Sequence, residues 1–177
     1  MPEKPVKPLP FLQNGVYQVA ILVPDLMEAI KHFYEDWGVG PWKIFTYGKP
    51  TCKETTYYGK PADYQMRLGL SMAGPMRFEL IQPLSGESIY ADFIAEHGYG
   101  VHHFGLLVDD MPTAMADARA AGYEVIMDGS GFGLEGDGHY AYLDTEDKLY
   151  VTLELIDQPK ERQTPEAIYP PKPENPI

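Results

Sequence analysis

Two pairs of similar stretches place residues with metal-binding side chains at matching positions. Residues 77–81 (RFELI) resemble residues 152–156 (TLELI), and each stretch holds a Glu, at 79 and 154, inside an apolar, strand-like run. Residues 18–25 (QVAILVPD) and 103–110 (HFGLLVDD) form a second pair at a similar offset. We infer that the chain contains one structural unit twice, with Gln18 matching His103 and Glu79 matching Glu154.

These four side chains could all bind one divalent metal if they meet in the folded chain. One imidazole, two carboxylates and one amide oxygen form a plausible ligand shell for Zn²⁺, Ni²⁺, Co²⁺ or Mn²⁺. On the concave face of a curled sheet, an unpaired carboxylate costs several kcal/mol. Two facing carboxylates therefore require a divalent cation or a shared proton.

Each residue taken singly also has an ordinary structural explanation. Glu79 and Glu154 are compatible with the solvated face of an antiparallel sheet, the usual place of a strand glutamate. Gln18 fits a sheet edge, and His103 fits a hydrogen-bonded position in the core. The repeat favours the metal site, because a pseudo-twofold axis puts equivalent residues on the same face of equivalent strands.

The pattern of apolar residues predicts the elements that position these side chains. A helix begins after the N-cap Asp25, with Glu28 completing a capping box, and another begins after Asp110. A connecting helix spans 88–97, with Ser88 as its cap. Strands are predicted at 17–23, 42–47, 64–72 and 76–82, and again at 102–108, 123–127, 138–143 and 150–156. A short extended piece is also expected around 55–58.

The predicted fold class is α+β. Two βαβββ modules form a curled eight-stranded cavity with the helices on the outer faces. The predicted organisation is an extended proline-rich arm (1–15), a first module (16–85), a connecting helix (86–99), a second module (100–157) and a proline-rich C-terminal arm (158–177). The glycine-rich stretch 129–138 is either a long hairpin or a lid over a site.

Composition excludes some classes of partner. The chain has 177 residues and a formal net charge of −12, so nucleic acid and anionic membrane surfaces are poor partners. A single cysteine, Cys52, fits a reducing compartment. No apolar run reaches the roughly 20 residues that span a bilayer, and the first residues do not resemble a secretory signal. We expect a cytoplasmic protein.

The repeated stretches resemble the vicinal oxygen chelate superfamily, which includes glyoxalase I, methylmalonyl-CoA epimerase, extradiol dioxygenases and bleomycin-resistance proteins. Residues 19–26 with 29–34 resemble its first strand and helix, and 100–110 (GVHHFGLLVDD) is the most recognisable stretch. Residues 79–86 (ELIQPLSG) resemble the epimerase branch. The likeness covers 16–157, so only the two arms lie outside it.

The resemblance implies that the metal ligands are Gln18, Glu79, His103 and Glu154, at the first and last strands of each module. This order of residue types is that of eukaryotic-type glyoxalase I, whereas methylmalonyl-CoA epimerase usually has His at the first position and Gln at the second. Extradiol dioxygenases need two His and one carboxylate, which Gln18 does not match.

The implied activity is proton transfer at the carbon next to a carbonyl group, through an enediolate, by a metal-dependent isomerase, epimerase or glyoxalase-type lyase. The resemblance assigns Glu154 as the base and Glu79 as a ligand or second base on the opposite face. A metal-free binding or sequestering module and an extradiol-type dioxygenase are the alternatives. Most members of the fold are homodimers, and a homodimer is expected here.

The substrate is a small molecule that the sequence constrains less. Aromatic segments that could line the cavity contain Trp42, Tyr57, Tyr58, Tyr64, Tyr140 and Tyr142. His139 could contact a substrate or merely lie in a hairpin. Coenzyme A or glutathione would require basic groups, for which Lys43, Arg67 and Arg77 are candidates without forming a cluster. A smaller neutral or aromatic carbonyl compound is equally compatible.

Overall fold

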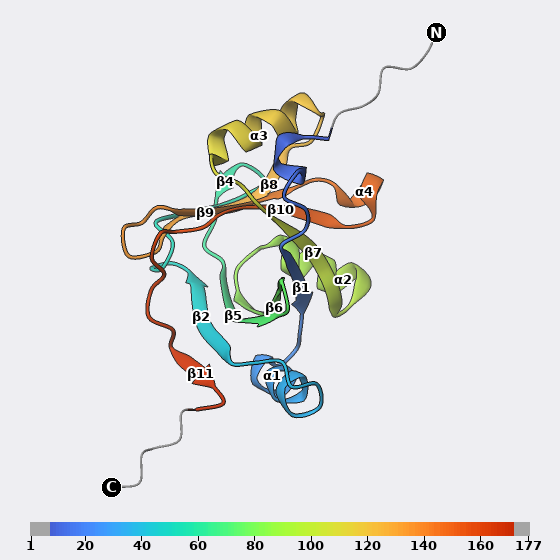
Figure 1. Ribbon diagram of the computed structural model, residues 1–177. Helices are drawn as coiled ribbons and strands as arrows, with labels where there is room; N and C mark the ends of the chain where they lie inside the picture. Colours follow the sequence, from blue (N-terminus) through green and yellow to red (C-terminus); the bar gives the residue numbers. More distant parts are fainter. Residues whose placement is uncertain (1–7, 172–177) are drawn as a thin grey trace, which may run out of the picture.

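The computed structural model describes residues 8–171 (Figure 1). The parts of the two predicted arms at 1–7 and 172–177 lie outside the described residues. Within 8–171, no helix is both long enough and apolar enough to cross a membrane.

The first module has the predicted order of elements. It comprises β1 (Gln18–Leu22), α1 (Leu26–Glu35), β2 (Trp42–Gly48), β3 (Glu54–Tyr57), β4 (Lys60–Pro61), β5 (Gln65–Ala73) and β6 (Met76–Ser85). Asp25 caps α1, because its side chain accepts a 2.9 Å hydrogen bond from the backbone N–H of Glu28. Leu26 and Ile30 are fully buried, which fixes α1 against the outer face of the sheet together with Trp42.

The second module repeats this order. α2 (Ile89–His97) connects the modules, and the second module comprises β7 (Gly100–Leu107), α3 (Met111–Ala120), β8 (Val125–Phe132), β9 (Gly138–Leu143), α4 (Glu146–Leu149) and β10 (Thr152–Asp157). Asp110 accepts a 3.0 Å hydrogen bond from the backbone N–H of Thr113, and Ser88 caps α2 in the same way. Ala114 and Ala118 of α3 are buried against the second half of the sheet.

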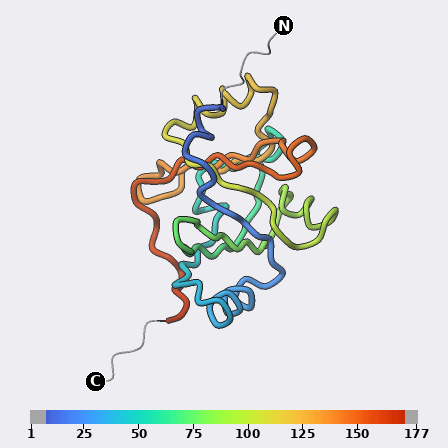
Figure 2. Tube along the Cα trace, turned by 45° about the vertical axis from the view of Figure 1, so that its right-hand side comes forward, coloured from blue at the N-terminus to red at the C-terminus, as the bar shows by residue number. Residues whose placement is uncertain are grey.

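All strands within the described residues belong to one sheet, in the order β11-β2-β5-β6-β1-β7-β10-β9-β8-β3-β4, where β11 is Ala167–Tyr169. The antiparallel pair β1–β7 joins the modules, and each of these strands pairs in parallel with the last strand of its own module, β6 or β10. Figures 1 and 2 show the sheet curling round. Helices α1 and α3 both lie outside the curl, at opposite ends of the molecule. The α+β fold class is therefore confirmed.

The strand count differs from the prediction. The described residues contain eleven strands rather than eight, because three short strands extend the sheet at its ends. β3 and β4 arise in the segment where a short extended piece was expected, and β3 pairs with β8 of the second module. β11 lies in the C-terminal arm and pairs with β2 through residues 167–169 and 42–44. An open strand edge presents unpaired backbone groups, which explains why a proline-rich segment is recruited there.

The arms pack on the modules where they are described. Phe11, in the short 3₁₀ helix η1 (Pro10–Leu12), is buried against α3. The glycine-rich stretch is largely β8 and β9, which form a hairpin with its connection at 133–137. Beyond β10, the C-terminal segment runs down one side of the molecule to β11 (Figure 2).

Candidate metal centre

Backbone register brings the four predicted ligands together on four adjacent strands, β6, β1, β7 and β10. Gln18 of β1 pairs with Gly105 of β7, which pairs with Glu154 of β10. Two residues further along β1, Ala20 pairs with both His103 of β7 and Glu79 of β6. Residues two apart on a strand share a face, so all four side chains project from the same concave face, and all come from one chain.

Small residues keep the space between these side chains open. A Cβ atom at Gly105 would lie 2.8 Å from the Cβ of Gln18 and 3.2 Å from Glu154 Oε2, closer than ordinary contacts allow. Ala20, between Glu79 and His103, has the smallest side chain after glycine and is fully buried. The sheet centre is thus shaped to let four longer side chains converge.

His103 lies between the two carboxylates. Its Nε2 is 3.2 Å from Glu154 Oε2 and 3.3 Å from Glu79 Oε2, and its side chain is fully buried. Burial by itself lowers the pKa of His103, but the charges and hydrogen bonds of Glu154 and Glu79 outweigh it and raise the pKa to about 9. The imidazole of His103 therefore carries a second proton at neutral pH, unless a bound metal takes the place of the proton on Nε2.

A second histidine orients the first. His102 Nδ1 is 2.8 Å from His103 Nδ1, so one ring donates to the other and Nε2 of His103 is directed at the carboxylates. Burial, with the nearby His103, holds the pKa of His102 well below its usual value, so His102 is neutral. Metal-binding histidines are commonly held by such a hydrogen bond on the ring nitrogen that does not bind the metal.

Gln18 connects the carboxylates to an arginine. Its Nε2 donates to Glu79 Oε2 at 2.8 Å and to Glu154 Oε2 at 2.9 Å, while its Oε1 accepts from Arg77 Nε at 2.6 Å. In this orientation the amide nitrogen faces the cluster. Coordination through Oε1 would require the amide to turn over, which would set its NH₂ group against the N–H of Arg77.

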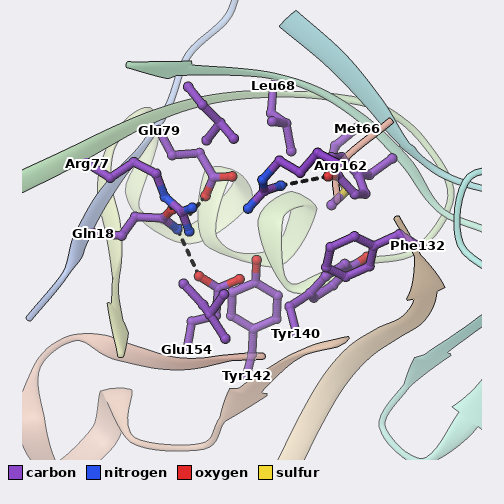
Figure 3. A pocket seen from close by; sticks show the side chains of 13 residues that line it. Gln18, Met66, Leu68, Arg77, Glu79, Phe132, Tyr140, Tyr142, Glu154 and Arg162 are labelled. Carbon is purple, nitrogen blue, oxygen red and sulfur yellow. Dashed lines mark hydrogen bonds between the residues drawn. The ribbon is translucent and has the colours of Figure 1, made fainter. Parts of the chain in front are cut away.

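The cluster opens into a cavity enclosed by the curled sheet. The space in this cavity that is open to the centre of a water-sized sphere is about 30 Å³. Its walls contain Gln18, Tyr47, Met66, Leu68, Leu70, Arg77, Glu79, Phe132, Tyr140, Tyr142, Glu154, Ile156 and Arg162. Figure 3 shows Glu79 and Glu154 entering this space from opposite walls. Burial, followed by the charge of Arg162, lowers the pKa of Arg77.

Comparisons with known proteins agree with this architecture. Residues 17–143 match the model of the Glyoxalase/Bleomycin resistance protein/Dioxygenase superfamily, which is more than half of the chain. The chain belongs to this superfamily. The resemblance to vicinal oxygen chelate proteins is thereby confirmed.

Several solved structures share the superfamily fold with this chain. Methylmalonyl-CoA epimerase from Mycobacterium tuberculosis is 19% identical, with a TM-score of 0.59, and the match covers 80% of this chain and 86% of that one. A Streptomyces coelicolor methylmalonyl-CoA epimerase variant in complex with 2-nitronate-propionyl-CoA is 20% identical, with a TM-score of 0.60 over 80% of this chain and 94% of the other. A hypothetical protein from Bacillus halodurans C-125 is 18% identical, with a TM-score of 0.61, over 84% and 97% respectively. No curated protein matches the sequence.

The ligands available in this member of the superfamily suit a divalent metal. One ligand atom each from Glu79, His103 and Glu154 lies within 4.8 Å of the other two, and all three residues are buried. Two carboxylates in a space with little water are stabilised by a dication. Imidazole and carboxylate donors match Zn²⁺, Ni²⁺, Co²⁺ and Mn²⁺. The residues therefore fit the metal that the superfamily commonly uses.

The predicted substrate residues separate into two groups. Tyr140 and Tyr142 line the cavity, and the Tyr142 ring lies 5.0 Å from that of His103. Burial raises the pKa of both tyrosines well above its usual value, so both hydroxyls stay protonated. Tyr64 lies behind this wall, with its hydroxyl 2.9 Å from that of Tyr140.

The other predicted substrate residues lie away from the cavity. Trp42 is buried under α1, where it packs on Phe33 with ring centroids 5.7 Å apart. Tyr57 and Tyr58 lie on β3 and its turn, and the Tyr57 hydroxyl donates to Asp92 of α2. His139 lies 2.9 Å from Asp128 in a surface depression on the far side of the hairpin. None of these four side chains lines the cavity.

Sequence reasoning missed several cavity residues. Arg162 comes from the C-terminal arm, where no periodicity indicates which side chains face inward. Strand alternation is the signal that could have found four of them. Ile156 shares a face of β10 with Glu154, and Met66, Leu68 and Leu70 share one face of β5. Tyr47 and Phe132 lie where β2 and β8 end, at positions where alternation alone is ambiguous.

Metal affinity is expected to rise with pH. Below the pKa of about 9, His103 must release a proton before Nε2 can bind a metal, because a coordinating imidazole is neutral. The association constant for Co²⁺ should therefore increase about tenfold per pH unit between pH 6 and 8. Calorimetric titrations in two buffers with different ionisation enthalpies should show close to one proton released per metal at pH 7. A pH-independent affinity would contradict this ligand assignment.

Proposed function

We propose that this protein is a metal-dependent enzyme that transfers a proton at the carbon next to a carbonyl group, as an isomerase, an epimerase or a glyoxalase-type lyase. The observation that supports it is the convergence of His103, Glu79 and Glu154 at the inner end of a cavity with aromatic and apolar walls. Superfamily membership and the epimerases among its structural neighbours support the same class of reaction.

The two carboxylates divide the chemistry between them. A bound divalent metal would polarise the carbonyl oxygen of the substrate and so acidify the neighbouring C–H bond. Glu154 takes that proton on a carboxylate oxygen, and the electron pair of the broken C–H bond forms the C=C bond of an enolate, which is an enediolate when the same carbon carries a hydroxyl group. In the enediolate, return of the proton to the former carbonyl carbon gives an isomer. Because Glu79 enters from the opposite wall (Figure 3), its delivery of a proton to the other face of the same carbon gives an epimer.

The remaining residues hold this arrangement. His102 and Gln18 position His103 and the carboxylates through the hydrogen bonds described above. The protonated hydroxyl of Tyr142 is paired with that of Tyr90 at 2.6 Å, so the wall beside Glu154 presents an aromatic face and adds no charge. Apolar side chains of β5 limit access of water to the carbanion.

The alternatives predict different results. An extradiol-type dioxygenase requires two His and one carboxylate, whereas the group assembled here contains one His and two carboxylates. A sequestering module would bind its ligand with no metal. Elemental analysis of the purified protein that gives about one metal per chain would contradict the sequestering module.

The activity can be tested without knowing the substrate. Purified protein is incubated in D₂O with hydroxyacetone, dihydroxyacetone or methylmalonyl-CoA, and loss of the α-proton signal is followed by ¹H NMR. We expect exchange above the buffer rate with Co²⁺ or Zn²⁺ and a return to the buffer rate after chelation with EDTA. Exchange that continues unchanged in metal-free protein would refute the metal-dependent mechanism.

A further inference from the structure

The four arginines of the chain fall into two kinds. Arg67 and Arg119 lie on the outside of the molecule, where they pair with Glu166 and Glu124. Arg77 and Arg162 line the cavity. Across residues 8–171, neither of these two cavity arginines has a carboxylate within 4.0 Å.

Arg77 is held against the wall of the cavity. It is only 7% exposed, and its guanidinium lies over the Tyr17 ring at 4.7 Å while Nε donates to Gln18. Its other contact is a long 3.4 Å hydrogen bond from Nη1 to Gln158. A guanidinium has five N–H donors, so Arg77 retains donors that these neutral partners do not use.

Arg162 enters the cavity from the C-terminal arm. Its Nη1 donates to the Tyr47 hydroxyl at 2.8 Å, and Figure 3 shows its guanidinium directed into the space between Glu79 and the wall that carries Tyr140. The backbone on both sides of Arg162 is fixed. Leu134 N–H donates to the carbonyl of Glu161 at 2.9 Å, and Glu166 N–H donates to Ile44 at 2.9 Å. The arm is thus tied to both modules around this residue.

The charges in the cavity do not balance without an anion. With a dication bound to neutral His103, the metal and the two arginines outweigh Glu79 and Glu154 by two positive charges. This positive excess stands in a protein whose formal net charge is −12. Because a charge held away from water is costly unless it is paired, the cavity is suited to a ligand that brings negative charge.

We propose that the substrate is a carbonyl compound with a carboxylate group, and that Arg162, assisted by Arg77, binds this carboxylate beside the metal centre. Planar guanidinium groups bind carboxylates through two parallel hydrogen bonds. The carboxylate would replace the missing acidic partner of the two arginines. The reaction carried out on this acid rests on the proposed function, whereas the recognition of its carboxylate does not.

Pyruvate and pyruvamide are matched probes, because they share a carbon skeleton and differ in the charge of one group. Binding of each is measured by ligand-observed NMR titration, with the metal-loaded protein and with the chelated protein. We expect pyruvate to bind at least tenfold more tightly than pyruvamide in both forms. Arg162→Met and Arg77→Met should weaken pyruvate binding at least tenfold and change pyruvamide binding by less than twofold.

Arg119→Met is the control, because it removes the same charge from the outside of the molecule, where Arg119 pairs with Glu124. Equal binding of the two probes, or an equal loss with Arg119→Met, would overturn the proposal. If Arg162→Met does not fold, judged by circular dichroism, Arg162→Lys serves instead. Lysine keeps the positive charge but cannot form the bidentate pair with a carboxylate. An intermediate loss of pyruvate binding is then expected, and unchanged binding would overturn the proposal.

The two proposals can fail separately. Pyruvate binding that depends on Arg162 in a protein that takes up no metal would leave the carboxylate site standing and remove the proposed function. Metal-dependent proton exchange, with no preference for pyruvate over pyruvamide, would support the proposed function and remove the carboxylate site.

Discussion

Replacing Glu154 with Gln is expected to slow metal-dependent proton exchange by roughly 10²–10⁴-fold, the usual contribution of a positioned general base. Gln has nearly the same shape and keeps the packing at this 4% exposed position, but its amide does not accept a proton at neutral pH. The rate is measured by ¹H NMR in D₂O on whichever probe the native protein exchanges.

Metal content separates the two roles that Glu154 could have. A variant that retains the metal and loses exchange identifies Glu154 as the base, whereas loss of both identifies it as a necessary ligand. Glu135→Gln is the matched control, because Glu135 is a 64% exposed side chain that pairs with Lys160 on a surface loop. Full activity in Glu154→Gln would show that the base is another residue.

Glu79→Gln adds a test of stereochemistry. If Glu79 delivers a proton to the opposite face, this variant should still exchange the α-proton while inverting the carbon more slowly than it exchanges. Equal slowing of exchange and inversion would instead assign Glu79 to the metal alone.

Metal binding is expected to stabilise the folded protein strongly, and His103→Ala should remove that effect. At a free metal concentration of about 1,000 times Kd, binding stabilises by about 4 kcal/mol. For a domain of this size, this corresponds to a rise in Tm on the order of 10 °C. The measurement is thermal unfolding with Co²⁺ and with EDTA. An undiminished rise in His103→Ala would contradict the assigned centre.

The same variant should be less stable even without metal. Protonated His103 is then the cation between two buried carboxylates, and breaking a buried pair by removing one partner costs about 3–5 kcal/mol. His103→Gln keeps a hydrogen-bond donor at this position and serves if the Ala variant does not fold. His32→Ala is the control, because His32 pairs with Asp36 on the exposed side of α1.

Local sequence patterns predicted the helices and most strands, and they placed the four candidate ligands at equivalent positions, because capping and strand alternation depend on short-range physics. Asp25, Ser88 and Asp110 cap the helices as expected, since a side-chain oxygen at the N-cap satisfies backbone N–H groups in any context. The repeat identified Glu79 and Glu154 as equivalent positions, and strand alternation placed each on a common face with its neighbours. Whether the protein is a homodimer and where it acts in the cell stay predictions.

Tertiary structure decided what the patterns left open. The antiparallel pairing of β1 with β7 sets Gly105 between Gln18 and Glu154, and no local signal specifies which strand edges meet. Trp42 and Tyr57 are suited to a pocket by residue type, but Trp42 is buried under α1 and the Tyr57 hydroxyl donates to Asp92 of α2, away from the cavity.

The positive charge of the cavity also depends on the tertiary structure. Arg162 reaches the cavity through an arm whose sequence has no periodicity, because its place depends on backbone hydrogen bonds to two distant segments at 134 and 44. The sequence by itself thus determined the helices, the main strands and the equivalence of Gln18 with His103 and of Glu79 with Glu154. Only the long-range pairing of strands and arm determined that Arg77 and Arg162 share their cavity, because contacts between residues far apart in the chain are absent from any local pattern.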